Sequence, residues 1–287
     1  MALVAGIDIG SGTSKCVLLD ETGTVRGQGL SRTKADFERV AREVLDLARQ
    51  DAGARADDVT YVATTGLGRY AVPFRDIQIT DLTCGARGAA TEFPSTRYVL
   101  DIGAQCSRAI KLRDGGKVKE FHMNEKCAAG SGGFLERAAK YLEVGVGDIG
   151  PLSLGAGKPQ AISSVCAVLA ESEIINHVSE GVGVENILRG IHNSLADRAL
   201  SLLKRVGLDG EVTLIGGVAL QAGMVAALRD KLGVPVNVPA TPQYAAALGA
   251  ALLGLQRFRK LRDGGGGLSG KERANGPFRI LEPRRMP

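Results

Sequence analysis

Aromatic residues are scarce in this sequence. It contains no tryptophan, and phenylalanine and tyrosine together make up 4% of its 287 residues. No sequence pattern of a known nucleic-acid-binding module is present either. The formal net charge of +5 therefore does not predict a nucleic-acid partner. Part of the basic excess lies in the last segment, where it favours a solvated tail or a docking surface for an acidic partner.

Long hydrophobic runs are also absent. The longest uncharged stretch of small and apolar residues covers 244–255, which is shorter than the roughly 20 residues that a membrane-spanning helix needs. The N-terminus has no basic leader and enters a strand-like pattern directly, so we expect no signal peptide. These features predict a cytoplasmic protein without a membrane partner.

Cysteines are few and do not occur in metal-binding pairs. The five cysteines, at positions 16, 84, 106, 127 and 166, form no Cys-x-x-Cys motif. In a chain with cytosolic features this argues against a disulfide framework. A cysteine with a special role would then be a metal ligand or a redox-active thiol, and the alternative for each is a small buried apolar side chain.

What the sequence does have is an alternation of strand-like and helix-like segments. Strands are expected over 3–9, 15–21, 160–164 and 212–217, and helices over 35–50, 132–143, 186–206 and 244–255, with another helix beginning near Cys166. This alternation predicts an α/β fold. The chain is long enough for two lobes that each bury a core. The alanine- and glycine-rich helix over 244–255 would permit close backbone packing between those lobes.

Two segments of the chain have the same order of strand-like run, turn and strand-like run. Gly6-Ile-Asp-Ile-Gly10 and Leu100-Asp-Ile-Gly103 each end an apolar run, lead into a turn of small residues and precede another strand-like run. The match is short, but its position suggests a duplicated lobe.

The first of these segments has the chemistry of a phosphate-binding turn. Glycine lets backbone N–H groups approach an anion, hydroxyl groups add donors, a lysine adds positive charge, and a carboxylate can hold Mg²⁺ through water. The residues concerned are Asp8, Ser11, Gly12, Thr13, Ser14 and Lys15. The alternative is an ordinary glycine-rich hairpin, because neither P-loop nor dinucleotide-binding spacing is met.

The second segment offers a matching site in Asp101, Gly103, Ala104 and Gln105. Two such hairpins facing each other across a cleft could grip a triphosphate and its metal from both sides, so Asp8 and Asp101 are the candidate catalytic carboxylates. Gly216 and Gly217 stand between an apolar strand and a helix, where a backbone passes close to a ligand or simply turns.

Together these features resemble a known superfamily. The two Asp-x-Gly hairpins, the Gly-Gly turn and the alanine-rich final helix resemble the acetate and sugar kinase, heat-shock 70 and actin superfamily of ATPases. Within it, the segments NEKCAAGSGGFLE (124–136), AISSVCAVLAESEII (161–175) and IGGVALQAGM (215–224) resemble the ATP-driven electron activators of benzoyl-CoA reductase and 2-hydroxyacyl-CoA dehydratase. The resemblance covers nearly the whole chain.

The resemblance implies a two-lobed actin-like ATPase fold, with duplicated ribonuclease H-like lobes and a nucleotide cleft between them. We expect one lobe to comprise residues 1–97 and 243–260 and the other residues 98–242, followed by a flexible basic tail over 261–287. It also implies ATP and Mg²⁺ in the cleft, with Ala129 and Gln243 at nucleotide-contacting positions.

Cys127 and Cys166 match the positions that hold iron in these activators. The resemblance implies that each of two homologous ATPase subunits, related by a pseudo-twofold axis, gives two cysteines to one shared [4Fe-4S] cluster. Four thiolates from two chains suit such a cluster. Reduced ferredoxin would supply the electrons, and catalytic subunits that bind benzoyl-CoA would receive them.

The chain departs from the activators at four positions, and at one of them Gly85 stands where they often carry histidine between a cysteine and an alanine. Ala104 and Cys106 stand where the second hairpin usually has glycine and aspartate, and Leu220 stands where the Gly-Gly turn usually continues to glutamine. These changes favour one half of a heterodimer, as in the delta-type ATP-binding subunits of benzoyl-CoA reductase. The alternatives are a homodimeric activator of a 2-hydroxyacyl-CoA dehydratase, a small-molecule kinase of the same superfamily and a catalytically silent assembly protein.

Overall fold

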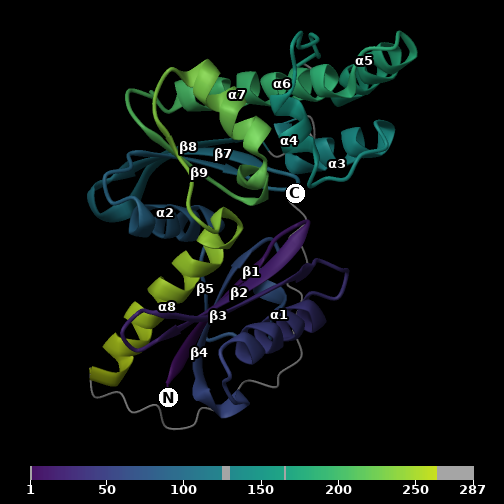
Figure 1. Cartoon of the computed structure of the whole chain (residues 1–287). Helices are drawn as coiled ribbons and strands as arrows, with labels where there is room; N and C mark the ends of the chain where they lie inside the picture. Colours follow the sequence, from purple (N-terminus) through teal and green to yellow (C-terminus); the bar gives the residue numbers. More distant parts are fainter. Residues whose placement is uncertain (1, 125–129, 165, 264–287) are drawn as a thin grey trace, which may run out of the picture.

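A computed structural model describes residues 2–124, 130–164 and 166–263. Within them the chain forms two five-stranded mixed sheets, each flanked by helices (Figure 1). None of the described helices is long and apolar enough to cross a membrane.

The first sheet has the strand order β3-β2-β1-β4-β5. Its strands are β1 (Leu3–Ile9), β2 (Thr13–Asp20), β3 (Val25–Arg32), β4 (Val59–Gly66) and β5 (Ile77–Gln78). The three N-terminal strands form an antiparallel meander, and β4 and β5 add to it in parallel. Every residue of β1 is buried, because helices cover both faces of this sheet.

The second sheet repeats this plan in the order β10-β9-β6-β7-β8. Its strands are β6 (Tyr98–Ile102), β7 (Ser107–Arg113), β8 (Lys117–Asn124), β9 (Val212–Ile215) and β10 (Val236–Asn237). Again three antiparallel strands are followed by two parallel ones. The duplicated lobe suggested by the two Asp-x-Gly segments is therefore confirmed, with β6 in the place of β1 and β7 in the place of β2.

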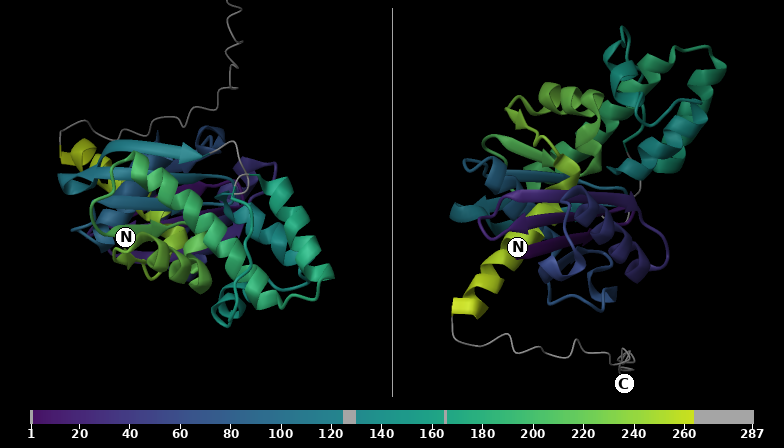
Figure 2. Two further views of the ribbon diagram at one scale, coloured as in Figure 1. Left: turned by 90° about the horizontal axis from the view of Figure 1, so that it is seen from above. Right: turned by 60° about the horizontal axis from the view of Figure 1, so that its bottom comes forward.

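Helices cover both faces of each sheet. On the first sheet, α1 (Phe37–Asp51) packs on one face and α8 (Ala245–Asp263) on the other. On the second sheet, α2 (Asp81–Glu92) covers one face, and the other carries α3 (Gly132–Tyr141), α6 (Val184–Arg205) and α7 (Ala222–Leu232). The remaining two α-helices of the described part are the short α4 (Ile149–Leu154) and α5 (Ala167–Ser179). Figure 2 shows the teal helices α3 to α5 projecting beyond the second sheet.

The two lobes meet where α2 and α8 pack together. A Cβ atom on Gly249 of α8 would lie 1.8 Å from the Cys84 carbonyl oxygen of α2, and one on Gly88 of α2 would lie 2.0 Å from the Ala245 carbonyl oxygen. Only glycine permits backbones to approach so closely. The close packing predicted for residues 244–255 is thus confirmed.

Two local expectations need correction. Residues 160–164 form no strand: the Gln160 N–H donates to the Asn186 carbonyl and the Ser163 N–H to Glu173, so this segment is bound to helices rather than to a sheet. The last helix also continues to Asp263, past the expected beginning of the tail at 261; residues 264–287 lie outside the described part.

Candidate functional site

A cavity of about 380 Å³ lies between the two lobes, where the hairpins of the two sheets face each other. A Cβ atom on Gly12 of the first hairpin would lie 2.6 Å from the methyl carbon of Ala104 in the second, which confirms the expected facing arrangement. Eleven of the predicted site residues line this cavity: Asp8, Ser11, Gly12, Thr13, Lys15, Asp101, Gly103, Ala104, Gly216, Gly217 and Gln243.

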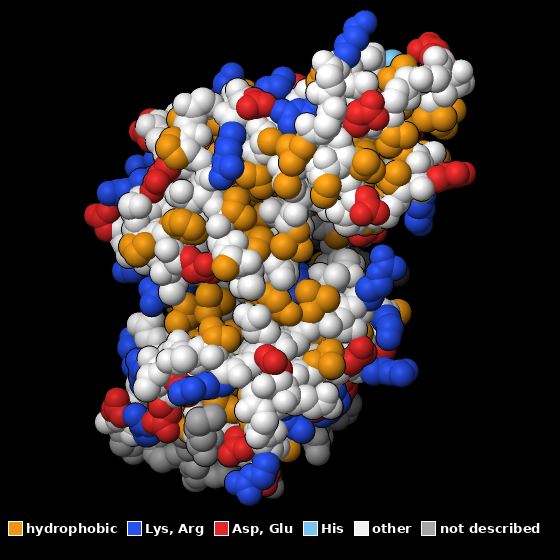
Figure 3. Space-filling view, in the orientation of Figure 1, with side chains coloured by type: hydrophobic (Ala, Val, Ile, Leu, Met, Phe, Trp, Pro, Cys, Tyr) orange, Lys and Arg blue, Asp and Glu red, His pale blue; other side chains and the backbone are white. Residues whose placement is uncertain are grey.

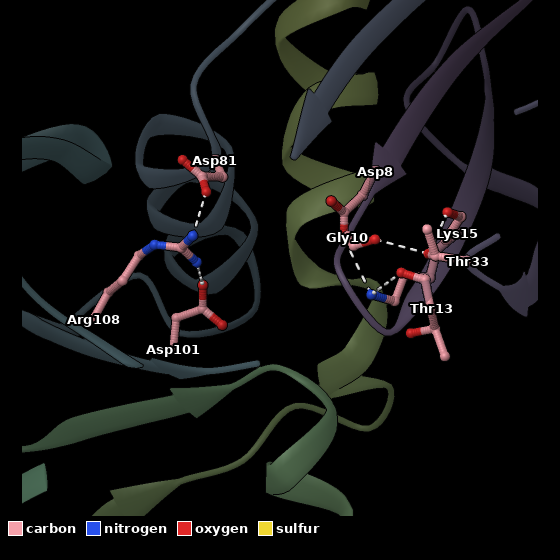
Figure 4. A network of polar contacts seen from close by, with 9 residues as sticks. Asp8, Gly10, Thr13, Lys15, Thr33, Asp81, Asp101 and Arg108 are labelled. Carbon is pink, nitrogen blue, oxygen red and sulfur yellow. Dashed lines mark hydrogen bonds and ion pairs between the residues drawn. The ribbon is translucent and has the colours of Figure 1, made fainter. Parts of the chain in front are cut away.

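In the first hairpin, Asp8 and Lys15 are cross-strand partners of β1 and β2. The Lys15 ammonium lies 3.2 Å from Asp8 Oδ2 and donates to the Thr13 carbonyl oxygen at 3.1 Å. The Thr33 hydroxyl donates to the Gly10 carbonyl and fixes the turn from outside (Figure 4). The lysine is therefore held in the cleft by a carboxylate and a carbonyl group.

The second hairpin also contains a carboxylate paired with a cation, and here the cation contacts two carboxylates. Asp101 and Arg108 are cross-strand partners of β6 and β7, and the Arg108 guanidinium lies 2.9 Å from Asp101 Oδ2. The second terminal nitrogen of the guanidinium, Nη2, lies 2.5 Å from Oδ2 of Asp81, which is the first residue of α2 (Figure 4). Burial raises the pKa of Asp101, and the charge of Arg108 opposes that shift. Burial alone would lower the pKa of Arg108, but the two carboxylates outweigh it and raise the pKa.

Each aspartate also lies against a glycine of the neighbouring parallel strand. Gly66 at the end of β4 has φ +84°, and Gly216 after β9 has φ +90°. A Cβ atom would lie 2.4 Å from Asp8 Oδ1 at the first and 2.7 Å from Asp101 Oδ1 at the second. The duplicated feature is therefore a carboxylate held between a cation on one side and a glycine with positive φ on the other.

The remaining predicted residues lie elsewhere. Ser14 is fully buried and shares a 2.8 Å hydrogen bond with Thr33, and Gln105 is exposed; neither lines the cavity. Ala129 and Cys127 lie outside the described residues.

Sequence reasoning missed Arg108, Asp81 and Gly66, all of which line the cavity. A signal for Arg108 exists in the sequence, because a basic residue follows the aspartate by seven positions in both hairpins.

Cys166 differs from the buried cysteines. It is the N-cap residue of α5, where the backbone N–H groups of Leu169 and Val168 lower the pKa of its thiol. Burial instead raises the pKa of Cys84 to about 12. A thiol at a helix N-terminus has its thiolate favoured and can serve as a metal ligand. Within the described part of the chain, no three His, Cys, Asp or Glu side chains gather as a metal site.

The first turn of α5, which follows Cys166, presents apolar side chains to solvent. Val168 and Leu169, in the first turn of α5, are 68% and 55% exposed, and Ile175 and Val178 are exposed farther along. Figure 3 shows hydrophobic side chains gathered at the upper right, over α3 and α5. Exposed apolar patches of this kind mark protein interaction sites.

Comparison with known proteins gives consistent relatives. One of the benzoyl-CoA reductase subunits of Thauera aromatica is 43% identical over 272 residues, which cover 91% of this chain and 96% of that protein. The 2-hydroxyisocaproyl-CoA dehydratase activator of Clostridioides difficile is 40% identical over 247 residues, covering 86% of this chain and 92% of the activator.

A solved structure agrees with these relatives. The activator of the 2-hydroxyisocaproyl-CoA dehydratase from Clostridium difficile, with bound ADPNP, matches with a TM-score of 0.88 at 37% identity and covers 91% of this chain and 97% of that one. The model of the BadF/BadG/BcrA/BcrD ATPase family matches residues 5–254. The chain therefore belongs to the BadF/BadG/BcrA/BcrD ATPase family and has the two-lobed fold of the actin-like ATPases.

Proposed function

We propose that this chain is the ATP-hydrolysing electron-transfer subunit of a benzoyl-CoA reductase, passing electrons from reduced ferredoxin to partner subunits that reduce the aromatic ring. The observation that carries the proposal is the position of Cys166. Its thiol stands at a helix N-terminus, next to the exposed apolar side chains of Val168 and Leu169, in the same lobe as one half of the nucleotide cleft. An ATPase that only transferred phosphate would not need such a thiol.

The cleft binds the nucleotide through its two hairpins. Backbone N–H groups of the Gly10–Thr13 turn and of the turn after Asp101 would face the phosphates, and the carboxylates of Asp8 and Asp101 would hold Mg²⁺ through water. Lys15, now paired with Asp8 at 3.2 Å, exchanges part of that contact for a phosphate oxygen. On the opposite side the Arg108 guanidinium would likewise exchange part of its contact with Asp101 for a phosphate oxygen, so the phosphates would draw both hairpins together.

Cys166 would hold an iron–sulfur centre together with Cys127. Cys166 fits this role because its thiolate is favoured by backbone N–H groups, which can also donate to cluster sulfides. Cys127 would be the second ligand from this chain, and a homologous ATPase subunit in a pseudo-twofold dimer would give two more. When bound, a [4Fe-4S] cluster supplies a one-electron relay.

ATP is needed because the electron must leave at a lower potential than it arrived. Each tenfold change in a one-electron equilibrium corresponds to about 59 mV, so a passive carrier cannot produce a much stronger reductant. Hydrolysis in a cleft between two lobes can supply that free energy through a two-state lobe motion.

The choice between a benzoyl-CoA reductase and a 2-hydroxyacyl-CoA dehydratase as the partner rests on sequence identity and on three substitutions. The benzoyl-CoA reductase relative is 43% identical and the dehydratase activator 40%, which is a small difference. Ala104, Cys106 and Leu220 lie in the cavity wall and favour one specialised half of a heterodimer. The second candidate is a homodimeric activator of a 2-hydroxyacyl-CoA dehydratase, supported by the match to the activator structure at a TM-score of 0.88.

The test is anaerobic purification of the chain with its genomic neighbours, followed by iron, sulfide and ATPase assays and by electron transfer from reduced ferredoxin to benzoyl-CoA. Cys127→Ser and Cys166→Ser should each remove most of the iron and abolish transfer. Cys84→Ala is the matched control, because Cys84 is buried with a raised pKa and should leave the iron content unchanged.

Unchanged iron content and electron transfer in both serine variants would refute the cluster. A stable iron-containing homodimer that hydrolyses ATP and activates a 2-hydroxyacyl-CoA dehydratase would favour the second candidate. Phosphate transfer to a small acceptor without iron would favour a kinase.

A further inference from the structure

The start of α3 is attached to the second hairpin at three points. The Gly132 N–H donates to the Gly103 carbonyl at 2.9 Å, and the Gly133 N–H donates to the Ala104 carbonyl at 2.8 Å. The Ser107 hydroxyl, at the start of β7, donates to the Gly130 carbonyl. The segment that enters α3 therefore follows any displacement of the hairpin that lines the nucleotide cavity.

The glycines of this segment permit the close approach. A Cβ atom on Gly133 would lie 2.9 Å from the Ala104 carbonyl oxygen, closer than real side chains come. Beyond them, Phe134 and Leu135 are buried in the same core as Ile102 of the hairpin, so side-chain packing reinforces the backbone hydrogen bonds. The glycines thus serve helix packing on the hairpin backbone.

The far end of α3 is joined to α5 by polar contacts. Arg137 Nε donates to Glu171 Oε1 at 2.6 Å, and the Tyr141 hydroxyl donates to Glu171 Oε2 at 3.2 Å. Arg137 and Tyr141 are one helical turn apart, so the carboxylate of Glu171 is held by two successive turns of α3. A rotation or shift of α3 would therefore be transmitted to α5 through this carboxylate.

Apart from Glu171, α5 is held by packing into the core and by the segment that precedes it, whose Ser163 carbonyl also accepts from Ser194 of α6 at 3.0 Å. Ala170 and Ile174 pack into the core, whereas Val168 and Leu169 are exposed on the opposite side. Glu173 accepts from the Ser163 N–H at 2.6 Å and so ties the segment before Cys166 to the same helix. Cys166 and the N–H groups that lower its pKa move together with α5.

From these contacts we propose that Glu171 is the positioning residue that couples the state of the nucleotide cavity to α5 and Cys166. The coupling runs from Gly103 and Ala104 through the start of α3 to Arg137 and Tyr141, and from there to Glu171. The inference rests on the proposed ATPase and cysteine-ligand roles, but Arg137, Tyr141 and Glu171 themselves do not line the nucleotide cavity.

Hydrogen–deuterium exchange of the complete, metal-free chain tests the coupling. Exchange in α3 and α5 is compared with Mg²⁺·ADP, with Mg²⁺ and a non-hydrolysable ATP analogue, and without nucleotide, while nucleotide affinity is measured separately. In the unsubstituted chain we expect exchange in both helices to differ about fivefold between the two nucleotide states, the lower end of typical coupling between sites. In Glu171→Gln, α3 should keep its response and α5 should lose it.

Glu180→Gln is the matched control, because Glu180 lies at the end of α5 and pairs with His177 of its own helix. It should behave like the unsubstituted chain. Exchanging the charges, with Arg137→Glu and Glu171→Arg together, should restore the α5 response that either change alone removes.

An α5 response that survives Glu171→Gln overturns the proposal. So does a chain that binds nucleotide with a response in neither helix. Failure to bind nucleotide at all is seen in the separate affinity measurement, and it would refute the ATPase assignment of the cleft as well.

Discussion

The hairpins β1–β2 and β6–β7 have the same architecture but differ in how firmly the cation is held. Lys15 bonds one carboxylate, Asp8, and a carbonyl within its own hairpin. Arg108 bonds two carboxylates, Asp101 and Asp81, and the second belongs to α2. A planar guanidinium can bridge two carboxylates, whereas an ammonium group acts as a single point charge. The first hairpin is therefore self-contained, and the second is tied to the helix that joins the lobes.

The largest expected effect comes from removing either aspartate. Asp8→Asn and Asp101→Asn should each lower the ATP turnover of the assembled complex by about 100-fold or more, because each removes an anionic oxygen that, in the proposed function, holds the phosphate-bound metal. Steady-state ATPase assays with the complex measure this effect. Equal losses of turnover would mean that the two aspartates contribute equally to ATP hydrolysis. Normal turnover in either variant would show that its aspartate is not needed for hydrolysis.

The next prediction separates the two cations by stability. Arg108→Met should lower the free energy of unfolding by about 4 kcal/mol, because it leaves Asp101 and Asp81 without their partner in a buried site. Lys15→Met should cost about 2 kcal/mol, since one carboxylate at the cavity wall is affected. Denaturant unfolding of both variants measures these free energies. Equal losses of unfolding free energy would show that the two cations are held equally firmly.

A third prediction concerns pH and the second lobe, which contains all three histidines of the sequence. His192 is fully buried, and burial lowers its pKa to about 4. The unfolded chain binds a proton near pH 6.5 that the folded chain excludes, so stability should fall as pH drops from about 6.5 to about 4. The loss approaches about 3 kcal/mol at the lower end. Unfolding midpoints of His192→Gln and of the unsubstituted chain across this range measure it, and parallel curves would argue against a neutral buried imidazole.

An effect as small as that of Lys15→Met is expected at the paired glycines. Gly66→Ala and Gly216→Ala should each cost about 2 kcal/mol, because positive φ and the nearby carboxylate both disfavour a side chain. Thermal unfolding of the two variants should give similar shifts, since the two sites have matching geometry. A clearly larger loss at one position would indicate that the duplication is less regular than the backbone suggests.

The sequence revealed the duplicated hairpins because an aspartate between two apolar residues, followed by glycine, is a local pattern. It did not reveal Arg108, whose partner Asp81 is distant along the chain and is brought near by the packing of α2. Helix α2 itself has three turns of small residues without a clear apolar stripe, so its pattern is weak.

Residues 160–164 show the opposite error. Their apolar and hydroxyl residues suit a strand, but the backbone groups of this segment find partners on α5 and α6. Ser14 fits a phosphate-binding pattern by sequence, yet strand alternation turns its hydroxyl away from the cavity towards Thr33. Both errors arise because local composition does not specify which distant element supplies the hydrogen-bond partner.

The packing of α2 and α8 bears on how the molecule can be divided. Helix α2 follows the last strand of the first sheet but covers Val99 and Ile110 of the second, whereas α8 follows the second sheet and covers Val4 and Leu19 of the first. Each lobe is thus completed by a helix from the other half of the sequence. A cut near residue 97 would leave the second sheet without its cover, so a fragment meant to fold as the second lobe should begin before Asp81 rather than at 98.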